Sequence, residues 1–376
     1  MKTNRLFLFG SFIFVFLNVS VFLTAEEIQA NPAWQTIDQA YIAFERGELG
    51  LSFSLCEKAR KIHIETMQDY AKKLSSAISS PAILKVGEDI NLVRLKLVER
   101  KEVEAASIID MVLRVRDESF FNKKIQNLYS WLVKRASYPE ADMLCGDIYS
   151  AEGEYVLAMD HYMKAWQQND LLTVPGERFS LCYRMADISR ITGDYGAQEQ
   201  FLLLVLTEDP VFGKPGKESS TLLGMKRTLE STTDGEKFYS LYRHRNSVAL
   251  KAYQDLSVYY YVRSGKRLDS ALSVATLAAV ISITMLDDFL LQKNIDYEYA
   301  SFTDTLTQSA KFPDILEEAS RLKFWDSFII FAEILYDQGK TTIAEGMISD
   351  LVYSCPDSSK TVKAQGLLKR MMTETR

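Results

Sequence analysis

One spacing pattern recurs along this 376-residue chain and restricts the folds open to it. In its clearest copy, Gly146 lies seven residues before Gly153. Four residues then follow at intervals of three, four and three: Tyr155, Ala158, Tyr162 and Ala165. These intervals put the four side chains on one face of an α-helix, and a glycine suits the left-handed turn that ends a preceding helix. The segment therefore predicts two helices joined by a tight turn.

The same register occurs at three other places and, more loosely, at a fourth. In the three close copies a small residue again lies seven positions before a glycine: Ala40 and Gly47, Ala186 and Gly193, and Ala332 and Gly339. The looser copy contains Gly265 and has one extra residue before Leu268. A single helix pair cannot bury its apolar face, so neighbouring pairs must stack on one another.

These units resemble the tetratricopeptide repeat, in which two antiparallel helices meet through small residues. The resemblance covers residues 33–66, 139–172, 179–212 and 325–358, and more loosely 252–284. It implies an all-α fold, a right-handed superhelical solenoid of antiparallel helix pairs. The intervals between copies leave room for seven to nine pairs. Asp142 and Cys182 stand where the family has a tryptophan, and residues 66–138 and 285–324 cannot be assigned to units.

The chain divides into four regions. Residues 26–208 form an expected N-terminal array and residues 237–376 a C-terminal one. Between them, residues 209–236 are rich in glycine, serine and threonine, which predicts an irregular loop or a seam between two lobes. Residues 1–25 form a separate targeting segment.

The N-terminal segment has the layout of a secretory signal peptide. Lys2 and Arg5 precede an uncharged apolar stretch from Leu6 to Leu23, and Ala25 offers a small residue for cleavage. The bulky Leu23 fits a cleavage site poorly, and the 18 apolar residues approach the length of a membrane-spanning helix. An uncleaved anchor with membrane association is thus the alternative. Either interpretation predicts an exported protein of the bacterial periplasm or cell envelope.

Composition argues against several functions. The net charge of −6 does not favour nucleic-acid phosphates. His63, His161 and His244 are isolated along the chain, and no catalytic, metal-binding or cofactor-binding signature accompanies them, so no enzyme activity, metal or cofactor is expected. Cys56 and Cys145 fall on repeat positions that favour small buried residues, which predicts buried thiols. Among the four cysteines, Cys145 and Cys182 are the only pair suited to a disulfide, because they lie on the first helices of adjacent units.

The resemblance implies that the first helix of each unit lines a groove for an extended peptide or partner helix. Carried over by register, the groove residues are Met143, Asp147, Tyr183, Asp187, Arg190, Ile329, Glu333 and Tyr336. The expected function is a protein-interaction scaffold with a protein or peptide partner. Two alternatives remain: a periplasmic small-ligand-binding accessory protein of a transport system, with the aromatic and basic segment 237–267 forming its pocket, or a structural envelope component.

Overall fold

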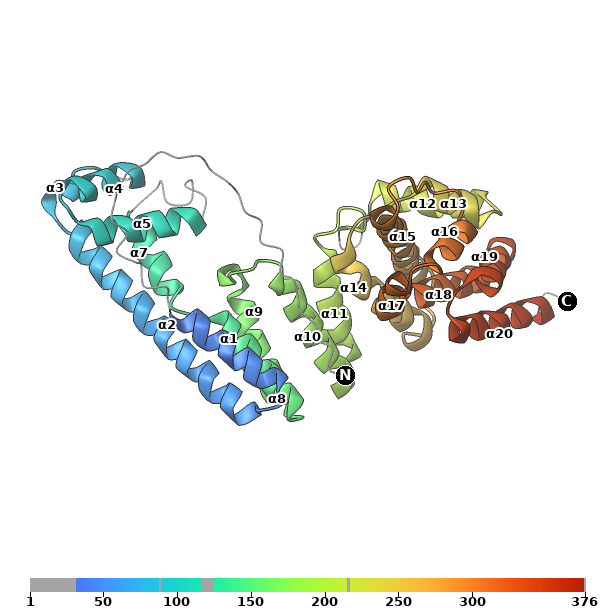
Figure 1. The fold of residues 1–376 in the computed structure, drawn as a ribbon, viewed down its shortest axis with the longest axis horizontal. Helices are drawn as coiled ribbons and strands as arrows, with labels where there is room; N and C mark the ends of the chain where they lie inside the picture. Colours follow the sequence, from blue (N-terminus) through green and yellow to red (C-terminus); the bar gives the residue numbers. More distant parts are fainter. Residues whose placement is uncertain (1–31, 88, 116–124, 215–216, 375–376) are drawn as a thin grey trace.

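The computed structural model describes residues 32–374 apart from residue 88 and the segments 116–124 and 215–216 (Figure 1). The predicted targeting segment, residues 1–25, lies outside the described residues. Within them the chain is all-helical except for one short hairpin, formed by strands β1 (Gly213–Lys214) and β2 (Lys217–Glu218). This confirms the predicted all-α class.

Five helix pairs occupy the segments that carry the recurring pattern. Within each pair the two helices pack against each other. The pairs are α1 (Pro32–Glu45) with α2 (Leu49–Ile78), α8 (Pro139–Ala151) with α9 (Tyr155–Gln167), α10 (Glu177–Thr192) with α11 (Tyr195–Leu206), α14 (Ser247–Val258) with α15 (Leu268–Lys293), and α18 (Phe324–Asp337) with α19 (Thr341–Ser354). A π-helical turn, η2 (Tyr259–Arg263), precedes the turn of the fourth pair.

The predicted glycines make the turns inside the pairs. Gly153 and Gly193 both have a φ of +82°, and the matching glycine of each other pair is left-handed as well. Side chains are strained in this conformation, whereas glycine adopts it freely. The spacing pattern thus predicted the glycine that makes the turn after each first helix.

The five pairs follow one another along the described part of the chain (Figure 1). Helices α1 and α2 contact α8, α9 contacts α10, α11 contacts α14, and α15 contacts α18. The final helix, α20 (Ser358–Glu374), packs on α19. This row contains five pairs in the described residues, fewer than the seven to nine expected, because the segments between the copies fold to its side.

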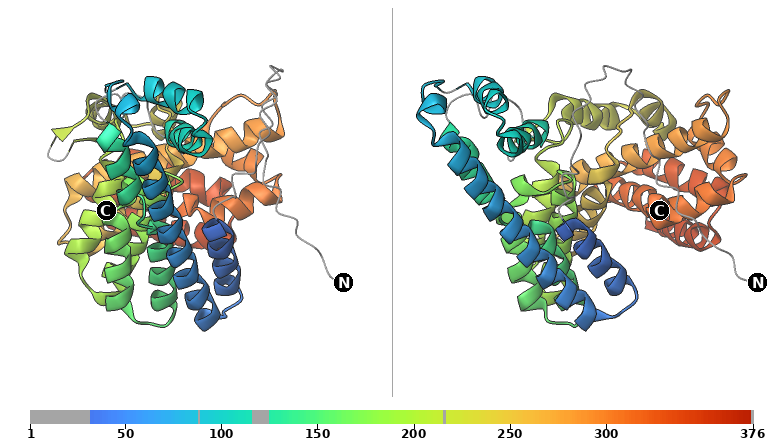
Figure 2. Two further views of the ribbon diagram at one scale, coloured as in Figure 1. Left: turned by 90° about the vertical axis from the view of Figure 1, so that its left-hand side faces the viewer. Right: turned by 60° about the vertical axis from the view of Figure 1, so that its left-hand side comes forward.

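The longest of these side segments forms a separate group on the second half of α2. It consists of α3 (Pro81–Leu84), α4 (Ile90–Glu99), α5 (Val103–Val115) and α7 (Ile125–Lys134). Figure 2 shows these helices gathered at the far end of α2 from α1. Their apolar residues make a core of their own with Met67, Ala71 and Leu74 of α2. The chain then returns, and α8 packs directly on the first pair.

Two shorter segments lie against the C-terminal pairs. They are α12 (Ser220–Ser231) with α13 (Gly235–Leu241), and α16 (Phe302–Ser309) with α17 (Pro313–Arg321). Helix α12 corrects the prediction of an irregular loop at 209–236. The Ser219 hydroxyl accepts a hydrogen bond from the Leu222 amide and caps the helix, and Leu222, Met225 and Leu229 are buried. Their helical spacing outweighed the turn-forming composition around them.

Helix α15 forms the centre of the C-terminal half. By length and composition it could cross a membrane, yet 78% of its apolar window is buried inside the protein. Its hydroxyls bond to carbonyls four residues earlier, as Thr276 does to Leu272 (2.7 Å) and Ser282 to Ala278 (2.7 Å). It is therefore a core helix.

Three substitutions in the second pair test the register of the pattern. Ala158 is fully buried on α9, so Ala158→Leu should overpack the core and lower the free energy of unfolding by about 1–3 kcal/mol. Gly153→Ala meets open space but has a φ of +82°, which should cost on the order of 1 kcal/mol. Glu154→Leu changes an exposed side chain and should stay within about 0.5 kcal/mol. Denaturant midpoints should rank the variants in that order, and equal midpoints for Ala158→Leu and Glu154→Leu would contradict the register.

Candidate functional site

Two of the predicted groove residues are core residues. Met143 is 2% exposed and Ile329 is 1% exposed, and both belong to the main hydrophobic core. Neither can contact a partner on an open surface, so the prediction is wrong for these two positions. Neighbouring helices cover them, and the register of a single pair does not reveal which of its sides a neighbour will cover.

The last pair is also closed on this side. Glu333 accepts a salt bridge from Arg370 (3.1 Å), and the Tyr336 hydroxyl donates to the carbonyl of Met371 (3.3 Å). Both partners belong to α20. The C-terminal helix thus engages the two side chains that were expected to meet a partner in the last unit.

Asp147 joins two neighbouring helix pairs. Its carboxylate accepts hydrogen bonds from Arg184 of α10 at 2.6 and 3.0 Å and from the Tyr162 hydroxyl of α9 at 2.7 Å. Only 14% of its side chain is exposed. These contacts assign Asp147 a packing role between α8, α9 and α10. The sequence pattern missed Arg184, which lies beside the predicted Tyr183 and carries no signal of its own.

The other three predicted residues belong to a mixed polar surface, here called the α10–α14 face. It consists of Tyr183, Asp187 and Arg190 on α10 with Lys251 and Asp255 on α14. Lys251 bonds Asp255 at 2.7 Å and Asp187 at 3.4 Å, and its ammonium lies 5.1 Å from the centre of the Tyr183 ring. The Tyr183 hydroxyl donates to the Val248 carbonyl (2.5 Å), which joins the two helices.

The ionic residues of the α10–α14 face stay accessible. Asp187 and Lys251 each expose 44% of their side chains, and Arg190 exposes 53%. Arg190 and Asp187 are 3.8 Å apart, and such exposed pairs contribute about 0–1 kcal/mol. These charges can therefore exchange their present partners for those of another molecule at little cost.

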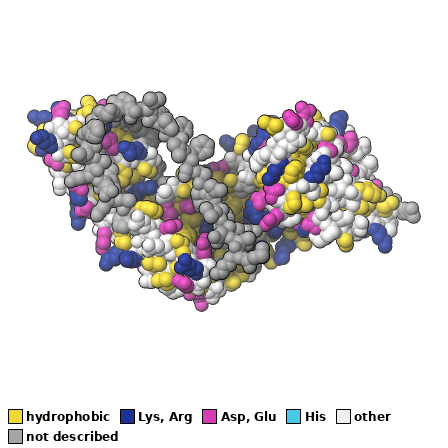
Figure 3. Space-filling model, in the orientation of Figure 1, with side chains coloured by type: hydrophobic (Ala, Val, Ile, Leu, Met, Phe, Trp, Pro, Cys, Tyr) yellow, Lys and Arg dark blue, Asp and Glu magenta, His cyan; other side chains and the backbone are white. Residues whose placement is uncertain are grey.

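On the side shown in Figure 3, acidic and basic side chains alternate with apolar ones over the described surface. No broad field of one sign covers this side. A phosphate backbone is bound through a concentration of positive charge. The distribution seen here fits a partner that offers both signs of charge.

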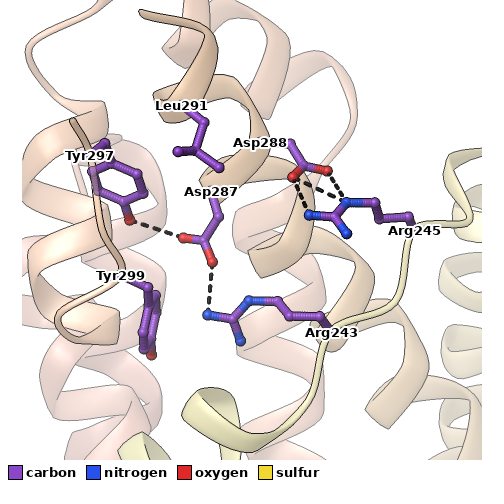
Figure 4. Close-up of a pocket in the computed structure, with 7 residues that line it drawn as sticks. All are labelled: Arg243, Arg245, Asp287, Asp288, Leu291, Tyr297 and Tyr299. Atoms are coloured by element: carbon purple, nitrogen blue, oxygen red, sulfur yellow. Dashed lines mark hydrogen bonds and ion pairs between the residues drawn. The ribbon is translucent and has the colours of Figure 1, made fainter. Parts of the chain in front are cut away.

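A small open pocket of about 170 Å³ lies beside residues 242–246, which connect α13 to α14. It is lined by Arg243, Arg245, Asp287, Asp288, Leu291, Tyr297 and Tyr299 (Figure 4). The two arginines come from the connection between α13 and α14, the carboxylates and Leu291 from α15, and the tyrosines from the connection between α15 and α16. Two stretches distant in sequence thus meet here: the connection between α13 and α14, and the end of α15 with the connection that follows it.

The charges of this pocket are matched within it. Arg243 reaches Asp287 at 2.8 Å and lies 4.4 Å from the centre of the Tyr299 ring, and Arg245 bonds both oxygens of Asp288 at 2.9–3.2 Å. Burial raises the pKa of Asp287 above its usual value, against the opposing effects of Arg243 and the Tyr297 hydroxyl. The pocket is a set of ion pairs that fastens the connecting segments to α15.

The aromatic segment 237–267 mostly forms core. Tyr239, Tyr253, Tyr260 and Tyr261 are all buried, with exposures of 7% or less. This segment contributes Arg243 and Arg245 to the pocket, whereas the pocket tyrosines come from elsewhere. These four tyrosines therefore do not line a ligand pocket, as the small-ligand alternative would require of this segment.

The histidines have separate polar partners. His63 contacts the Arg135 carbonyl (2.8 Å), His161 contacts Asp142 (3.1 Å), and His244 contacts Asp209 (2.7 Å). Across the described residues, no three histidine, cysteine, aspartate or glutamate side chains gather in a way that could hold a metal ion.

The cysteines pair differently from the prediction. The sulfur atoms of Cys56 and Cys145 lie 3.2 Å apart, and Cys182 remains a separate buried thiol. The predicted pair, Cys145 and Cys182, rested on their places on the first helices of adjacent units, and these units are indeed neighbours, since α9 packs on α10. Because α8 packs directly on α2, the first pair supplies the nearer sulfur.

Comparison with known proteins identifies a relative but supplies no function. No family model matches the chain. A protein of Treponema pallidum (strain Nichols), described only as "Uncharacterized protein", is 33% identical over 332 residues. The match covers 88% of this chain and 88% of the relative. The chain belongs to the same family as this Treponema pallidum protein.

Proposed function

We propose that this chain is an exported scaffold of the tetratricopeptide type that holds a peptide or protein partner on its α10–α14 face. The proposal includes a right-handed solenoid made from the five successive pairs. Its main support is that Asp187, Arg190 and Lys251 are accessible on neighbouring first helices. The other predicted groove residues are buried or are bound by other parts of the protein.

The chemistry of this face suits an extended chain with both charged and apolar side chains. Tyr183 offers a ring held in place by its hydroxyl, which donates to Val248 and accepts from the Ala252 amide (3.2 Å). Aromatic residues fixed in this way contribute contact area at little entropic cost. Charges of both signs lie beside the ring and set the orientation of the partner.

Site-specific photo-crosslinking in cells tests the proposal. A photoreactive residue replaces Arg190, and in a matched control it replaces Val156, which is 83% exposed on the second helix α9. A discrete crosslinked protein should form at position 190 and not at position 156. Equal products at both positions, or none at position 190, would count against this face.

The same cells test export, which rests on the sequence of residues 1–25. The protein should fractionate with the periplasm or the envelope, and the mature chain should begin near Glu26. A chain that keeps Met1 and stays with the membrane would indicate the anchor. A chain found in the cytoplasm would contradict export.

The pocket at Arg243 supports a second candidate, small-ligand binding as an accessory protein of a transport system. Its two guanidinium groups and two tyrosine rings could hold a small anion or an aromatic acid. Against it, both guanidinium groups already have carboxylate partners, which a ligand would need to displace. A small molecule that co-purifies and is lost in Arg245→Ala would favour this candidate. A structural envelope component would show neither a ligand nor a discrete crosslink.

A further inference from the structure

Two thiols from different helix pairs meet in the core between those pairs. Cys56 lies on α2 and Cys145 on α8, 89 residues apart in sequence, and their sulfur atoms are 3.2 Å apart. Both side chains are fully buried in the small apolar cluster that joins the first two pairs.

The surroundings of the two sulfurs favour one of them as a nucleophile. The Cys56 sulfur is 3.0 Å from the Ala141 carbonyl, and Cys145 lies 3.7 Å from the guanidinium of Arg60. The hydrogen bond from Cys56 lowers the pKa of Cys145, and the charge of Arg60 acts in the same direction. Arg60 is itself held between Glu57 and Asp142, at 2.8 Å from each. A thiolate is the form that attacks a disulfide.

We propose that Cys56 and Cys145 form a disulfide that fastens the first helix pair to the second. The oxidant is the disulfide of a thiol–disulfide oxidoreductase or of oxidised glutathione. The Cys145 thiolate attacks this disulfide and expels one thiolate, and the Cys56 thiolate then attacks the Cys145 sulfur and expels the other. The two cysteines lose two electrons and two protons, and the oxidant leaves as two thiols.

The position of the bond gives it a structural role. Cys56 and Cys145 are 89 positions apart, and the residues between them include the second half of α2 and the side group α3, α4, α5 and α7. Closing a loop of this length removes much of the conformational freedom of the unfolded chain. The bond needs the sulfurs to approach from 3.2 Å to about 2.05 Å, a movement within reach of side-chain rotation. Because both thiols are buried, oxidation takes place while the chain folds.

The proposal rests on the proposed export for its setting, since disulfides persist in oxidising compartments. The chemistry can be tested without that setting. The purified mature chain is refolded in a glutathione redox buffer, alkylated under denaturing conditions, digested and mapped by mass spectrometry. The peptides that contain Cys56 and Cys145 should be joined, and Cys182 and Cys355 should carry the alkyl group.

Thermal unfolding supplies the second measurement. The oxidised chain should unfold roughly 5–10 °C above the reduced chain. Cys145→Ser should abolish the difference, whereas Cys182→Ser, at another buried cysteine, should retain it. The mapping of the unmutated chain keeps the test valid where a variant fails to fold. An unjoined pair, a link to Cys182 or Cys355, or equal unfolding temperatures with and without reductant would overturn the proposal. Finding the protein in the cytoplasm would contradict the proposed export but not the disulfide chemistry, because the refolded chain would still form the bond.

Discussion

Asp209→Ala is expected to lower the free energy of unfolding by about 3–5 kcal/mol, because it removes the acceptor of a buried polar network. The Asp209 side chain is fully buried and accepts hydrogen bonds from His244 (2.7 Å), Tyr253 (2.7 Å), Asn246 (2.9 Å) and the Val211 amide (2.8 Å). Alanine would leave these donors without an acceptor in a region from which water is excluded.

This network joins the middle of the chain to its C-terminal half. Asp209 follows α11, Tyr253 is on α14, and the His244 amide donates to Thr284 of α15 at 3.0 Å. The neighbouring Glu208→Ala is the matched control. Glu208 exposes 51% of its side chain and pairs with Arg178 at the surface, so its loss should cost no more than about 1 kcal/mol. Equal midpoints for Asp209→Ala and Glu208→Ala in denaturant unfolding would contradict the stabilising role of this network.

Acid should weaken the same network. Burial by itself would raise the pKa of Asp209, but hydrogen bonds from His244 and Tyr253 bring it below its usual value. A carboxylate whose pKa is depressed on folding stabilises the protein above its unfolded pKa of about 3.9. That stability is lost as the pH falls through the lower folded pKa. The stability difference between Asp209→Ala and the unmutated chain should therefore shrink below about pH 4.

Asp287→Ala is the second substitution expected to destabilise the chain strongly, by about 3–5 kcal/mol. Asp287 is 8% exposed and faces Arg243, and its removal would leave that guanidinium without its carboxylate in a half-closed pocket. The Tyr297 hydroxyl, which donates to Asp287 at 3.0 Å, would lose its acceptor as well. Both groups are partly buried, with 28% of the Arg243 side chain exposed, so water replaces the lost carboxylate incompletely.

Asp288→Ala is the control within the same pocket. Asp288 bonds Arg245, whose side chain is 69% exposed, so water can replace the lost carboxylate. The expected cost is about 0–1 kcal/mol despite the two-pronged geometry of the pair. Calorimetric unfolding of both variants measures the contribution of each ion pair to stability. A larger loss of stability in Asp288→Ala than in Asp287→Ala would contradict the view that burial decides the strength of these pairs.

Local sequence alone determined the helix pairs of the recurring pattern and the turns inside them. The interval from Ala186 to Gly193 gave a helix that ends at a left-handed glycine, and the rhythm that follows gave α11. Pro210 and Pro356 lie shortly after two of the second helices, since α11 ends at Leu206 and α19 at Ser354. These features depend on contacts within a few residues, which the sequence displays directly.

Only the tertiary structure decided which faces stay open and which distant residues meet. Met143 and Asp187 occupy neighbouring register positions in the repeat, yet one is buried and the other is exposed because different helices cover them. Cys56 lies next to Cys145 because the residues between α2 and α8 fold to the side, which lets α8 pack directly on α2. Helical periodicity indicates how a helix packs on its partner in the same pair. Burial and contacts between units depend instead on the path of the chain between them. That path produces no periodic pattern in the sequence.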